Sequence, residues 1–383
     1  MGKCLSWKYF SLLLSLLFFH SQFPVSSSLS SNSQCSVLLH FNHSLSLNED
    51  AFTPPSYYYS SNIQMCENSY PKTGSWKEDK DCCAWDGVVC DNSTRHVIAL
   101  DLSCSWLYGF IDSNSTLFLL RHLRSLNLAG NFFRYSLISP EFGNFQSLTH
   151  LNLSNSFFNG QIPYEISQLS SLVSLDLSSN FLSIKTPVWK RVIGNLTQLR
   201  ELLLDETDTS SIRPNSLMNL SSSLTTLSLR YCGLQGKLEL NMFRLPSMQT
   251  LNLGHNENLQ GSLPKSNWNS SSLEFLDLSW INFSIKLPDF IGNLKSLKYL
   301  NLHGCCFTGE IPTSLGNLVQ ITFLDLLGNN FTGSIPASLG NLTQITSLDL
   351  HYNNFIGSIP TSLGNLTKLT YLDLSSNSFS GEI

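Results

Sequence analysis

The chain has 383 residues, and only 13% of them are charged, well below the ~25% of an average soluble domain. Its formal net charge of −5 is mild, and no basic run or acidic tail occurs, so composition argues against binding nucleic acid or a strongly basic partner. Length alone predicts two or three ordinary domains, but internal repetition overrides that estimate, because a stack of repeats grows along one axis.

The amino-terminal segment, residues 1–28, predicts a secretory signal peptide. It starts with two lysines in the first eight residues, continues with an apolar run from Phe10 to Phe19, and ends in small residues at Ser26 to Ser28. The apolar run is too short to cross a bilayer, which takes ~20 apolar residues. A myristoylation pattern at Gly2 and Ser6 is the competing interpretation, but the apolar core directly behind it favours secretion.

Residues 29–95 predict a cysteine-rich amino-terminal cap. A secreted cap that must seal an apolar core is a natural place for disulfides. Adjacent Cys82 and Cys83 must reach different partners, but six cysteines allow many pairings, so the residues alone leave the connectivity open. A metal site is disfavoured, because no paired C-x-x-C knuckles occur. The six cysteines in or beside the cap are Cys35, Cys66, Cys82, Cys83, Cys90 and Cys104.

The remainder, residues 96–383, repeats the pattern L-x-x-L-x-L about twelve times, with the last copy incomplete. The spacing is 24 to 27 residues, which is the signature of leucine-rich repeats, with Asn or Cys expected after the last Leu. After an irregular first copy at Val97 to Leu102, the copies start at Leu123, Leu148, Leu172, Leu199, Leu224, Met248, Leu273, Leu297, Ile321, Ile345 and Leu369. Asn occupies this position, the Asn position, at Asn131, Asn180, Asn256, Asn329, Asn353 and Asn377, and Cys occupies it at Cys232 and Cys305.

The repeats predict a solenoid. In "LTYLDLSSN", Leu372 and Leu374 are two residues apart and therefore point to one face of a short strand. One strand cannot bury its Leu face alone, so copies stack ~4.8 Å apart as a parallel sheet over a shared core. The rest of each unit, such as "FTGEIPTSLGNL" from Phe307 to Leu318, turns the chain back with a Gly and a Pro.

The cysteines inside the repeats are not expected to pair. Cys232 and Cys305 lie three repeats apart, roughly 14 Å at strand spacing, whereas a disulfide needs Cα atoms within ~7 Å. We expect both to be buried small residues in the Asn position, and Cys306 to be a free thiol.

Eleven Asn-x-Ser/Thr acceptors predict heavy glycosylation in a secreted protein. They are Asn42, Asn92, Asn114, Asn152, Asn195, Asn219, Asn269, Asn282, Asn330, Asn341 and Asn365.

The outward-facing strand positions carry the candidate ligand site. Aromatic residues gather there in successive copies, and an exposed aromatic patch usually marks a binding surface. The competing interpretation is that neighbouring rings merely stack along the sheet and stabilise it. The recurring Asn and Asp in the middle of each strand are too uniform to be ligand-specific and are expected to be scaffold. The candidates are Arg230, Tyr231, His255, Phe275, Trp280, Tyr299, His303, Phe323, His351 and Tyr352.

No catalytic motif occurs in the sequence: there is no phosphate-binding loop, H-E-x-x-H, G-x-S-x-G or dinucleotide fingerprint. The acidic pair Asp205 and Glu206 is expected to be a solvated surface. We therefore predict a protein that is not an enzyme and needs no cofactor or metal.

Three stretches resemble one family. The L-x-G-x-I-P unit is similar to plant extracellular leucine-rich repeats, and "SWKEDKDCCAWDGVVCD", Ser75 to Asp91, to the cap of plant receptor-like proteins. "LISPEFGNFQSLTHLNLSNSFFNGQIPYEIS", Leu137 to Ser167, resembles the Cladosporium-resistance type of these receptors. The resemblance implies an α/β solenoid, a right-handed superhelix with a parallel concave sheet and a disulfide-bonded cap. It also implies the pairs Cys83–Cys90, Cys35–Cys82 and Cys66–Cys104.

The same resemblance implies a function in recognition. The concave face would bind an extracellular protein or peptide ligand, often from a pathogen, and a co-receptor or adaptor receptor kinase would signal. In the full-length family a membrane span follows the repeats, whereas this sequence stops at "SGEI" inside a repeat, so we expect a fragment or a truncated product whose last coil frays. The alternative is a secreted inhibitor of a pathogen cell-wall-degrading enzyme, similar to the polygalacturonase-inhibiting proteins.

Overall fold

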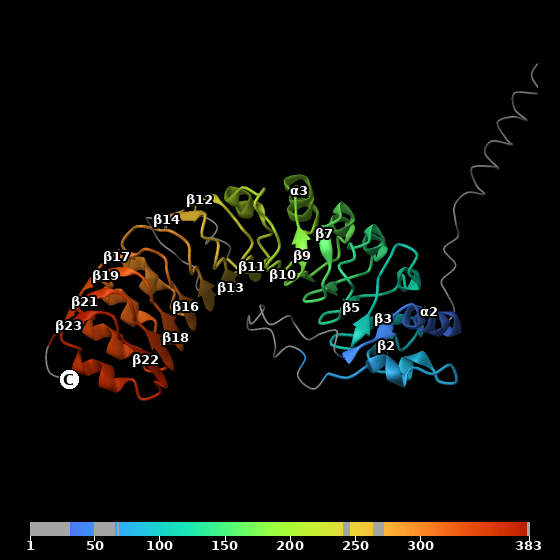
Figure 1. Cartoon of the computed structure of the whole chain (residues 1–383), viewed down its shortest axis with the longest axis horizontal. Helices are drawn as coiled ribbons and strands as arrows, with labels where there is room; N and C mark the ends of the chain where they lie inside the picture. Colours follow the sequence, from blue (N-terminus) through green and yellow to red (C-terminus); the bar gives the residue numbers. More distant parts are fainter. Residues whose placement is uncertain (1–30, 50–65, 67–68, 240–245, 263–271, 381–383) are drawn as a thin grey trace, which may run out of the picture.

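The computed structural model describes residues 31–49, 66, 69–239, 246–262 and 272–380, and within them the chain forms one long arc (Figure 1). The predicted signal peptide and the acceptor Asn269 lie outside the described residues. In the part of the chain that the structure describes, no helix is both long and apolar enough to cross a bilayer.

The inner side of the arc is a sheet built from the L-x-x-L-x-L segments (Figure 1). Neighbouring strands pair in register, so that Leu324 lies opposite Leu348, and Leu348 opposite Leu372. Every pair is parallel except the first, in which β2 runs antiparallel to β3. Within the described residues the sheet has thirteen strands, in the spatial order β2 (Val88–Cys90), β3 (Val97–Asp101), β5 (Ser125–Asn127), β6 (His150–Asn152), β8 (Ser174–Asp176), β10 (Glu201–Leu203), β11 (Thr226–Ser228), β13 (Thr250–Asn252), β15 (Phe275–Asp277), β16 (Tyr299–Asn301), β18 (Phe323–Asp325), β20 (Ser347–Asp349) and β22 (Tyr371–Asp373).

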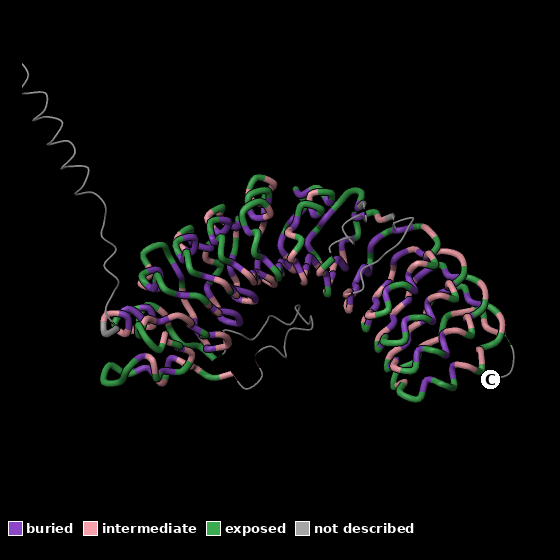
Figure 2. The backbone as a smooth tube through the Cα atoms, turned by 180° about the vertical axis from the view of Figure 1, so that it is seen from behind, coloured by how far each residue is buried: buried purple, intermediate pink, exposed green. Residues whose placement is uncertain are grey.

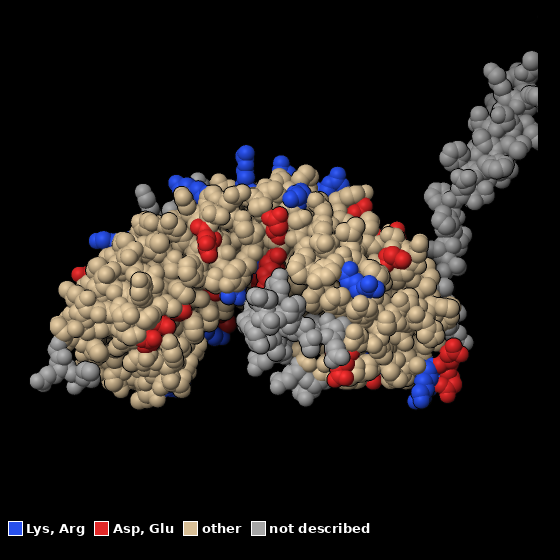
Figure 3. All heavy atoms as spheres, in the orientation of Figure 1, with Lys and Arg blue, Asp and Glu red and all other residues tan. Residues whose placement is uncertain are grey.

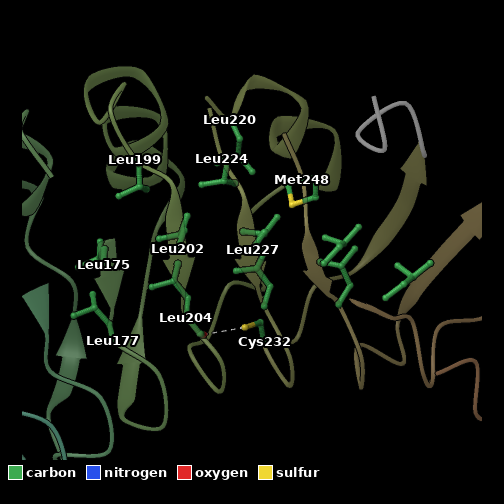
Figure 4. Packing of buried hydrophobic residues seen from close by; sticks show 14 of the residues in the cluster. Leu175, Leu177, Leu199, Leu202, Leu204, Leu220, Leu224, Leu227, Cys232 and Met248 are labelled. Carbon is green, nitrogen blue, oxygen red and sulfur yellow. Dashed lines mark hydrogen bonds between the residues drawn. The ribbon is translucent and has the colours of Figure 1, made fainter. Parts of the chain in front are cut away.

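The leucines of successive coils share one continuous interior. Leu348 and Leu350 are 0% exposed, and Figure 4 shows Leu202 and Leu227 of adjacent coils pointing into the same space. Buried and exposed positions alternate along the whole arc (Figure 2). Since full burial of one Leu contributes about 1.5–3 kcal/mol, each coil depends on its neighbours for most of its stability.

A column of buried phenylalanines belongs to the same core. Phe307, Phe331 and Phe355 are 0% exposed, and their successive ring centroids are 6.0 and 6.1 Å apart. Phe283 and Phe379 extend the column at 5.1 and 6.2 Å. We did not predict this column, although a Phe two residues after the Asn position recurs in these repeats.

The Asn position ties each coil to the previous one. Asn329 Nδ2 donates to the carbonyls of Leu302 and Leu326 at 2.8 and 3.0 Å, and its Oδ1 accepts from the Phe307 amide at 2.9 Å. Asn353 Nδ2 donates in the same way to the carbonyls of Leu326 and Leu350. Asn recurs because it satisfies buried backbone groups that the strands leave unpaired.

Other side chains in this position keep part of the arrangement. The Sγ of the buried Cys305 donates to the Leu278 carbonyl at 3.0 Å, and the Phe283 amide bonds the Cys305 carbonyl instead of a side chain. Cys232 donates to Leu204 at 3.1 Å (Figure 4). Both are unpaired thiols, as expected, and Cys306 is a half-buried free thiol. Ser156, Thr207 and Ile281 also occupy this position, which the pattern did not predict.

Each coil returns through a short helix opposite the sheet. Pro312 precedes one such helix with φ −66°, the value that its ring imposes. The Gly of "GNL" is needed for close packing, because a Cβ at Gly316 would lie 2.3 Å from the Ser338 carbonyl of the next coil. The described return helices are η5 (Thr116–Leu119), η6 (Pro140–Asn144), η7 (Tyr164–Gln168), α3 (Thr186–Asn195), η8 (Pro214–Asn219), η10 (Asp289–Asn293), η11 (Thr313–Asn317), η12 (Ala337–Asn341) and η13 (Thr361–Asn365).

Small side sheets join the segments that follow the Asn positions. They consist of β7 (Asn159–Gln161) with β9 (Phe181–Ser183), β12 (Gly236–Glu239) with β14 (Leu259–Ser262), and β17 (Thr308–Gly309), β19 (Asn330–Gly333), β21 (Asn354–Gly357) and β23 (Ser378–Phe379) in that order.

The cap covers the first coil. Helix α2 (Ser31–His43) places Leu38 and Phe41 in the core, and Gln34 Oε1 accepts from the Val97 amide of β3 at 2.9 Å. Strands β1 (Ser46–Leu47) and β4 (Leu107–Tyr108) pair antiparallel, and η3 (Lys72–Ser75) and η4 (Cys82–Ala84) complete the cap. Its disulfides are Cys35–Cys82, Cys66–Cys104 and Cys83–Cys90, the three pairs that the resemblance implies.

Candidate functional site

The residue just before each Asn position has a left-handed backbone. This geometry lets its amide donate to the next coil: Tyr231 bonds the Gly254 carbonyl at 3.1 Å, and Trp280 bonds that of His303 at 2.7 Å. An L-residue in this conformation costs about 1–2 kcal/mol, whereas Gly adopts it freely. The positions, with φ from 50° to 68°, are Cys104, Gly130, Asn155, Ser179, Glu206, Tyr231, His255, Trp280, Gly304, Gly328, Tyr352 and Ser376.

Three large rings occupy this position in successive coils. Tyr231 stacks on His255 with centroids 4.1 Å apart, and His255 lies 6.1 Å from Trp280, nearly parallel to it. Tyr231 and Trp280 are 46% and 39% exposed. The Arg230 guanidinium lies 4.7 Å from the Tyr231 centroid, and the His303 ring lies 5.1 Å from that of Trp280. We call these five residues the edge cluster.

The edge cluster contains ionisable side chains that lie close together, among them Arg230 and His255. Arg230 Nε is buried and has no hydrogen-bond partner among the described residues, while the side chain as a whole is half-buried. The pKa of His255 is lowered to about 4, first by burial and then by Arg230 and His303. The ring is therefore neutral at pH 7 and can lie beside Arg230.

Asp205 and Glu206 correct one expectation. They are not simply solvated: both are half-buried, and Asp205 Oδ1 accepts from Ser228 Oγ at 2.5 Å and from the Arg230 amide at 2.8 Å. Burial raises the pKa of both carboxyl groups. Through the hydrogen bond from the Arg230 amide, Asp205 fixes the backbone at that residue. Most of the surface seen in Figure 3 is uncharged.

Phe275, Tyr299 and Phe323 form a second group, which we call the strand ladder. They lie directly opposite one another on β15, β16 and β18. Their rings stack at 4.2 and 4.4 Å with interplanar angles of 9° and 4°. All three are half-buried, and burial together with Asp277 raises the pKa of Tyr299 to about 12. Cross-strand stacking accounts for this geometry, so the rings stabilise the sheet and offer mainly their edges to a ligand.

The last two candidates lie apart from the edge cluster. Tyr352 is 68% exposed, and two glycine positions, Gly304 and Gly328, separate it from Trp280. His351 Nδ1 is 2.6 Å from Ser375 Oγ. The ten predicted residues thus fall into three groups: the edge cluster, the strand ladder and this pair.

The mid-strand Asn and Asp side chains hold the backbone. Asp325 accepts from the Leu327 amide at 2.9 Å, and Asp349 from that of His351 at 2.8 Å, each two residues further on. This local bond accounts for their recurrence and supports the scaffold interpretation.

A side band of aromatic residues was missed by the sequence reasoning. Centroids of Tyr108 and Phe132, of Phe132 and Phe157, and of Phe157 and Phe181 lie 5.4, 4.5 and 6.2 Å apart. Tyr135 packs at 5.1 Å against Phe181 and is 49% exposed. The signal was a Phe directly after the Asn position in three successive repeats.

The glycan acceptors within the described residues differ in accessibility. Asn42 and Asn152 are half-buried, and Asn152 Oδ1 accepts from the Ser154 amide at 2.9 Å. The exposed acceptors are Asn92, Asn114, Asn195, Asn219, Asn282, Asn330, Asn341 and Asn365.

One group of potential metal ligands occurs within the described residues, Cys35, Asp81 and Cys82. Its two sulfurs are joined in a disulfide, which leaves only the Asp81 carboxylate to coordinate an ion.

Comparison with known proteins agrees with the fold. The family described as leucine-rich repeat region matches residues 288–382, and leucine-rich repeat matches residues 147–169. The structure of the PEPR1–AtPEP1 complex is 30% identical, with a TM-score of 0.66 over 92% of this chain and 49% of that one. A TDR receptor is 31% identical, with a TM-score of 0.63 over 73% and 49%. The chain is a leucine-rich-repeat solenoid with a parallel concave sheet and a disulfide-bonded cap.

Curated relatives narrow the class. Receptor-like protein 6 of Arabidopsis thaliana is 43% identical over 60% of this chain and 24% of its own length. In Solanum pimpinellifolium, receptor-like protein 9DC1 is 42% identical over 67% and 29%, and receptor-like protein Cf-9 is 39% identical over 72% and 32%.

The chain belongs with the plant leucine-rich-repeat receptor-like proteins, and it spans about a quarter to a third of the length of these relatives. Their names and the three disulfides indicate a protein of the secretory pathway or the extracellular space. These comparisons indicate no enzyme family, and they do not favour the inhibitor alternative.

Proposed function

We propose that this chain is the ligand-recognition part of a plant receptor-like protein at the outer face of the plasma membrane. Its concave side would bind an extracellular peptide or protein, pathogen-derived in a defence response, and partner kinases would signal. It would do so without catalysis, by surface complementarity on a rigid arc. Structural neighbours support a peptide-like ligand, because PEPR1 is complexed with AtPEP1 and the peptide hormone receptor RGFR1 with RGF2.

The edge cluster is the observation that carries this proposal. Tyr231, His255 and Trp280 have a left-handed backbone, which costs free energy for residues with a side chain. Later coils place a glycine at the equivalent position, Gly304 and Gly328, and so avoid this cost. Stacking is worth ~0.5–1.5 kcal/mol per pair, so it offsets this cost only in part. The left-handed backbone itself recurs in the other coils, so what distinguishes the edge cluster is that large, partly exposed rings fill this position in three successive coils. Clustered exposed aromatic residues are typical of binding surfaces.

The edge cluster suits an extended peptide. Half-exposed Tyr231 and Trp280 offer apolar ring surface, and the half-buried Arg230 side chain offers a positive charge to a carboxylate. The strand ladder and the pair His351 and Tyr352 would continue the contact along the concave face.

Glycine substitutions can separate binding from folding. The triple variant Tyr231→Gly, His255→Gly and Trp280→Gly removes three rings and also three left-handed penalties, so it is expected to stay folded. A phage-displayed random peptide library would be selected on the full wild-type chain. Selected peptides should bind the triple variant about tenfold more weakly or worse, a loss of ~1.4 kcal/mol or more.

Two results would remove the proposal. Either no peptide is enriched on the wild-type chain over an unrelated secreted protein, or the enriched peptides bind the wild-type chain and the triple variant equally. A matched control is Tyr164→Gly, which removes a 46% exposed ring from the opposite side of the solenoid and should leave peptide binding unchanged.

A further inference from the structure

A cavity of about 480 Å³ lies between the cap and the first coils, away from the concave face. The cap contributes polar side chains at the end of helix α2 and just after it, and the first coil contributes aromatic and polar ones. The lining residues include His40, Ser44, Tyr108, Phe110, Asp112 and Arg134.

The aromatic part of this cavity is exposed. Phe110 is 51% exposed, which is high for a large apolar side chain. The Arg134 guanidinium lies 4.8 Å from the Phe110 centroid and 5.3 Å from that of Tyr108. Within the described residues Arg134 makes no hydrogen bond or ion pair, so stacking holds its donors in place while they remain available.

A glycan acceptor is part of the same lining. Asn114 is exposed, starts the sequence Asn114–Ser115–Thr116, and lines the cavity together with Asp112. Asp112 Oδ1 accepts from the backbone amide of Asn114 at 3.0 Å, so the carboxylate is held close to the residue that would carry the glycan.

The chemistry of the lining matches that of a sugar. N-acetylglucosamine has one face of C–H groups, which packs on aromatic rings, and a rim of hydroxyl groups, which needs donors and acceptors. The cavity supplies the exposed ring of Phe110, a donor at Arg134 and an acceptor at Asp112. Tyr108 contributes its edge, because its ring stacks on Phe132 and lies against Arg134. A sugar attached at Asn114 has almost no translational freedom left to lose, so weak contacts suffice to hold it.

We propose that the N-glycan on Asn114 folds back into this cavity, with its first sugars covering Phe110 and Tyr108 and bonding Arg134 and Asp112. The glycan then covers apolar surface that the fold leaves exposed, and it links the cap to the first coil.

The test uses the full chain secreted from plant cell culture. Glycopeptide mass spectrometry measures occupancy of Asn114, and hydroxyl-radical footprinting measures the accessibility of Phe110 and Tyr108. Asn114→Gln should raise the oxidation rate of both rings several-fold. Asn341→Gln, which removes an exposed acceptor at the end of η12, should leave it unchanged. An empty Asn114 in the wild type, or equal rates in Asn114→Gln and wild type, overturns the proposal.

A second variant changes the cavity and leaves the glycan acceptor intact. In chains carrying oligomannose glycans, Phe110→Ser should speed the release of the Asn114 glycan by endoglycosidase H several-fold and leave release at Asn341 unchanged. Equal rates of release at Asn114 in Phe110→Ser and wild type would overturn the proposal. If Asn114 is unoccupied and added free chitobiose protects Phe110, the cavity binds a free sugar and the tethered-glycan proposal fails.

Discussion

Trp280 and Gly304 occupy the same left-handed position in adjacent coils, and the indole lies against the glycine. A Cβ added at Gly304 would stand 3.3 Å from Trp280 Cδ2. Because Gly304 has no side chain, the Trp280 ring of the preceding coil can pack against its backbone.

Gly304→Ala should lower the free energy of unfolding by about 1–2 kcal/mol, because Ala is strained at φ 65°, and it should displace the Trp280 ring. Chemical unfolding measures the first effect. Fluorine NMR of 5-fluorotryptophan-labelled protein, assigned with Trp280→Phe, measures the second. Gly328→Ala is the control, since its Cβ would meet His303 at 3.4 Å and not an indole. A Trp280 resonance that is unmoved in Gly304→Ala, or moved equally in both variants, would contradict this relationship.

Asn329→Ala should destabilise the solenoid by about 3 kcal/mol, because it leaves the buried Leu302 carbonyl and Phe307 amide without partners. The Leu326 carbonyl keeps its bond from Asn353. Asn377 makes the corresponding bonds to Leu350 and Leu374 but is only half-buried. Asn377→Ala should therefore cost about 1 kcal/mol, since water can replace it. Urea unfolding of both variants checks the difference, and equal losses would show that burial does not set the cost.

His255 predicts a pH dependence of stability. Its folded pKa of about 4 lies below the usual histidine pKa of 6.5, so the unfolded chain binds the proton more tightly. Stability from this group is complete above pH 6.5 and is lost as the pH falls toward 4. Thermal unfolding at pH 7 and pH 4.5 should show a smaller loss for His255→Gln than for the wild type. Identical losses in the two proteins would rule out this contribution.

Leu372 and Leu348 hold the same register position, but Leu372 is 45% exposed and Leu348 is 0% exposed. The coil around β22 is therefore less buried than the coil around β20. Its amides, and those of residues 345–380 generally, should exchange hydrogen faster than those of residues 148–180. Mass spectrometry of exchange checks this, and equal protection of the two regions would count against it.

The solenoid could be predicted because its cause is local and repeated. Leu348 and Leu350 must face one way in a short strand, and copies 24 residues apart can bury them only by stacking. The Asn position could be predicted for the same reason, and the hydrogen bonds of Asn329 supply its physical basis.

The site could be predicted only in part. Tyr231, His255 and Trp280 could be listed from their place at the strand ends, but their left-handed backbone follows from bonds between coils that no single repeat reveals. The strand ladder was named as a ligand site, and the structure shows that its rings cover one another. The cavity beside Asn114 could not be predicted, because it forms between α2 and segments some 70 residues further along the chain.

The measurement that tests the concave-face account most directly is hydrogen exchange of the full chain with and without a library-selected peptide. The account predicts protection that is strongest at the strand ends around residues 228–232, 252–256 and 277–281, that continues only along the concave strands toward β20, and that leaves the helices η11 to η13 unchanged. Protection confined to those return helices, or to the side band, would contradict it.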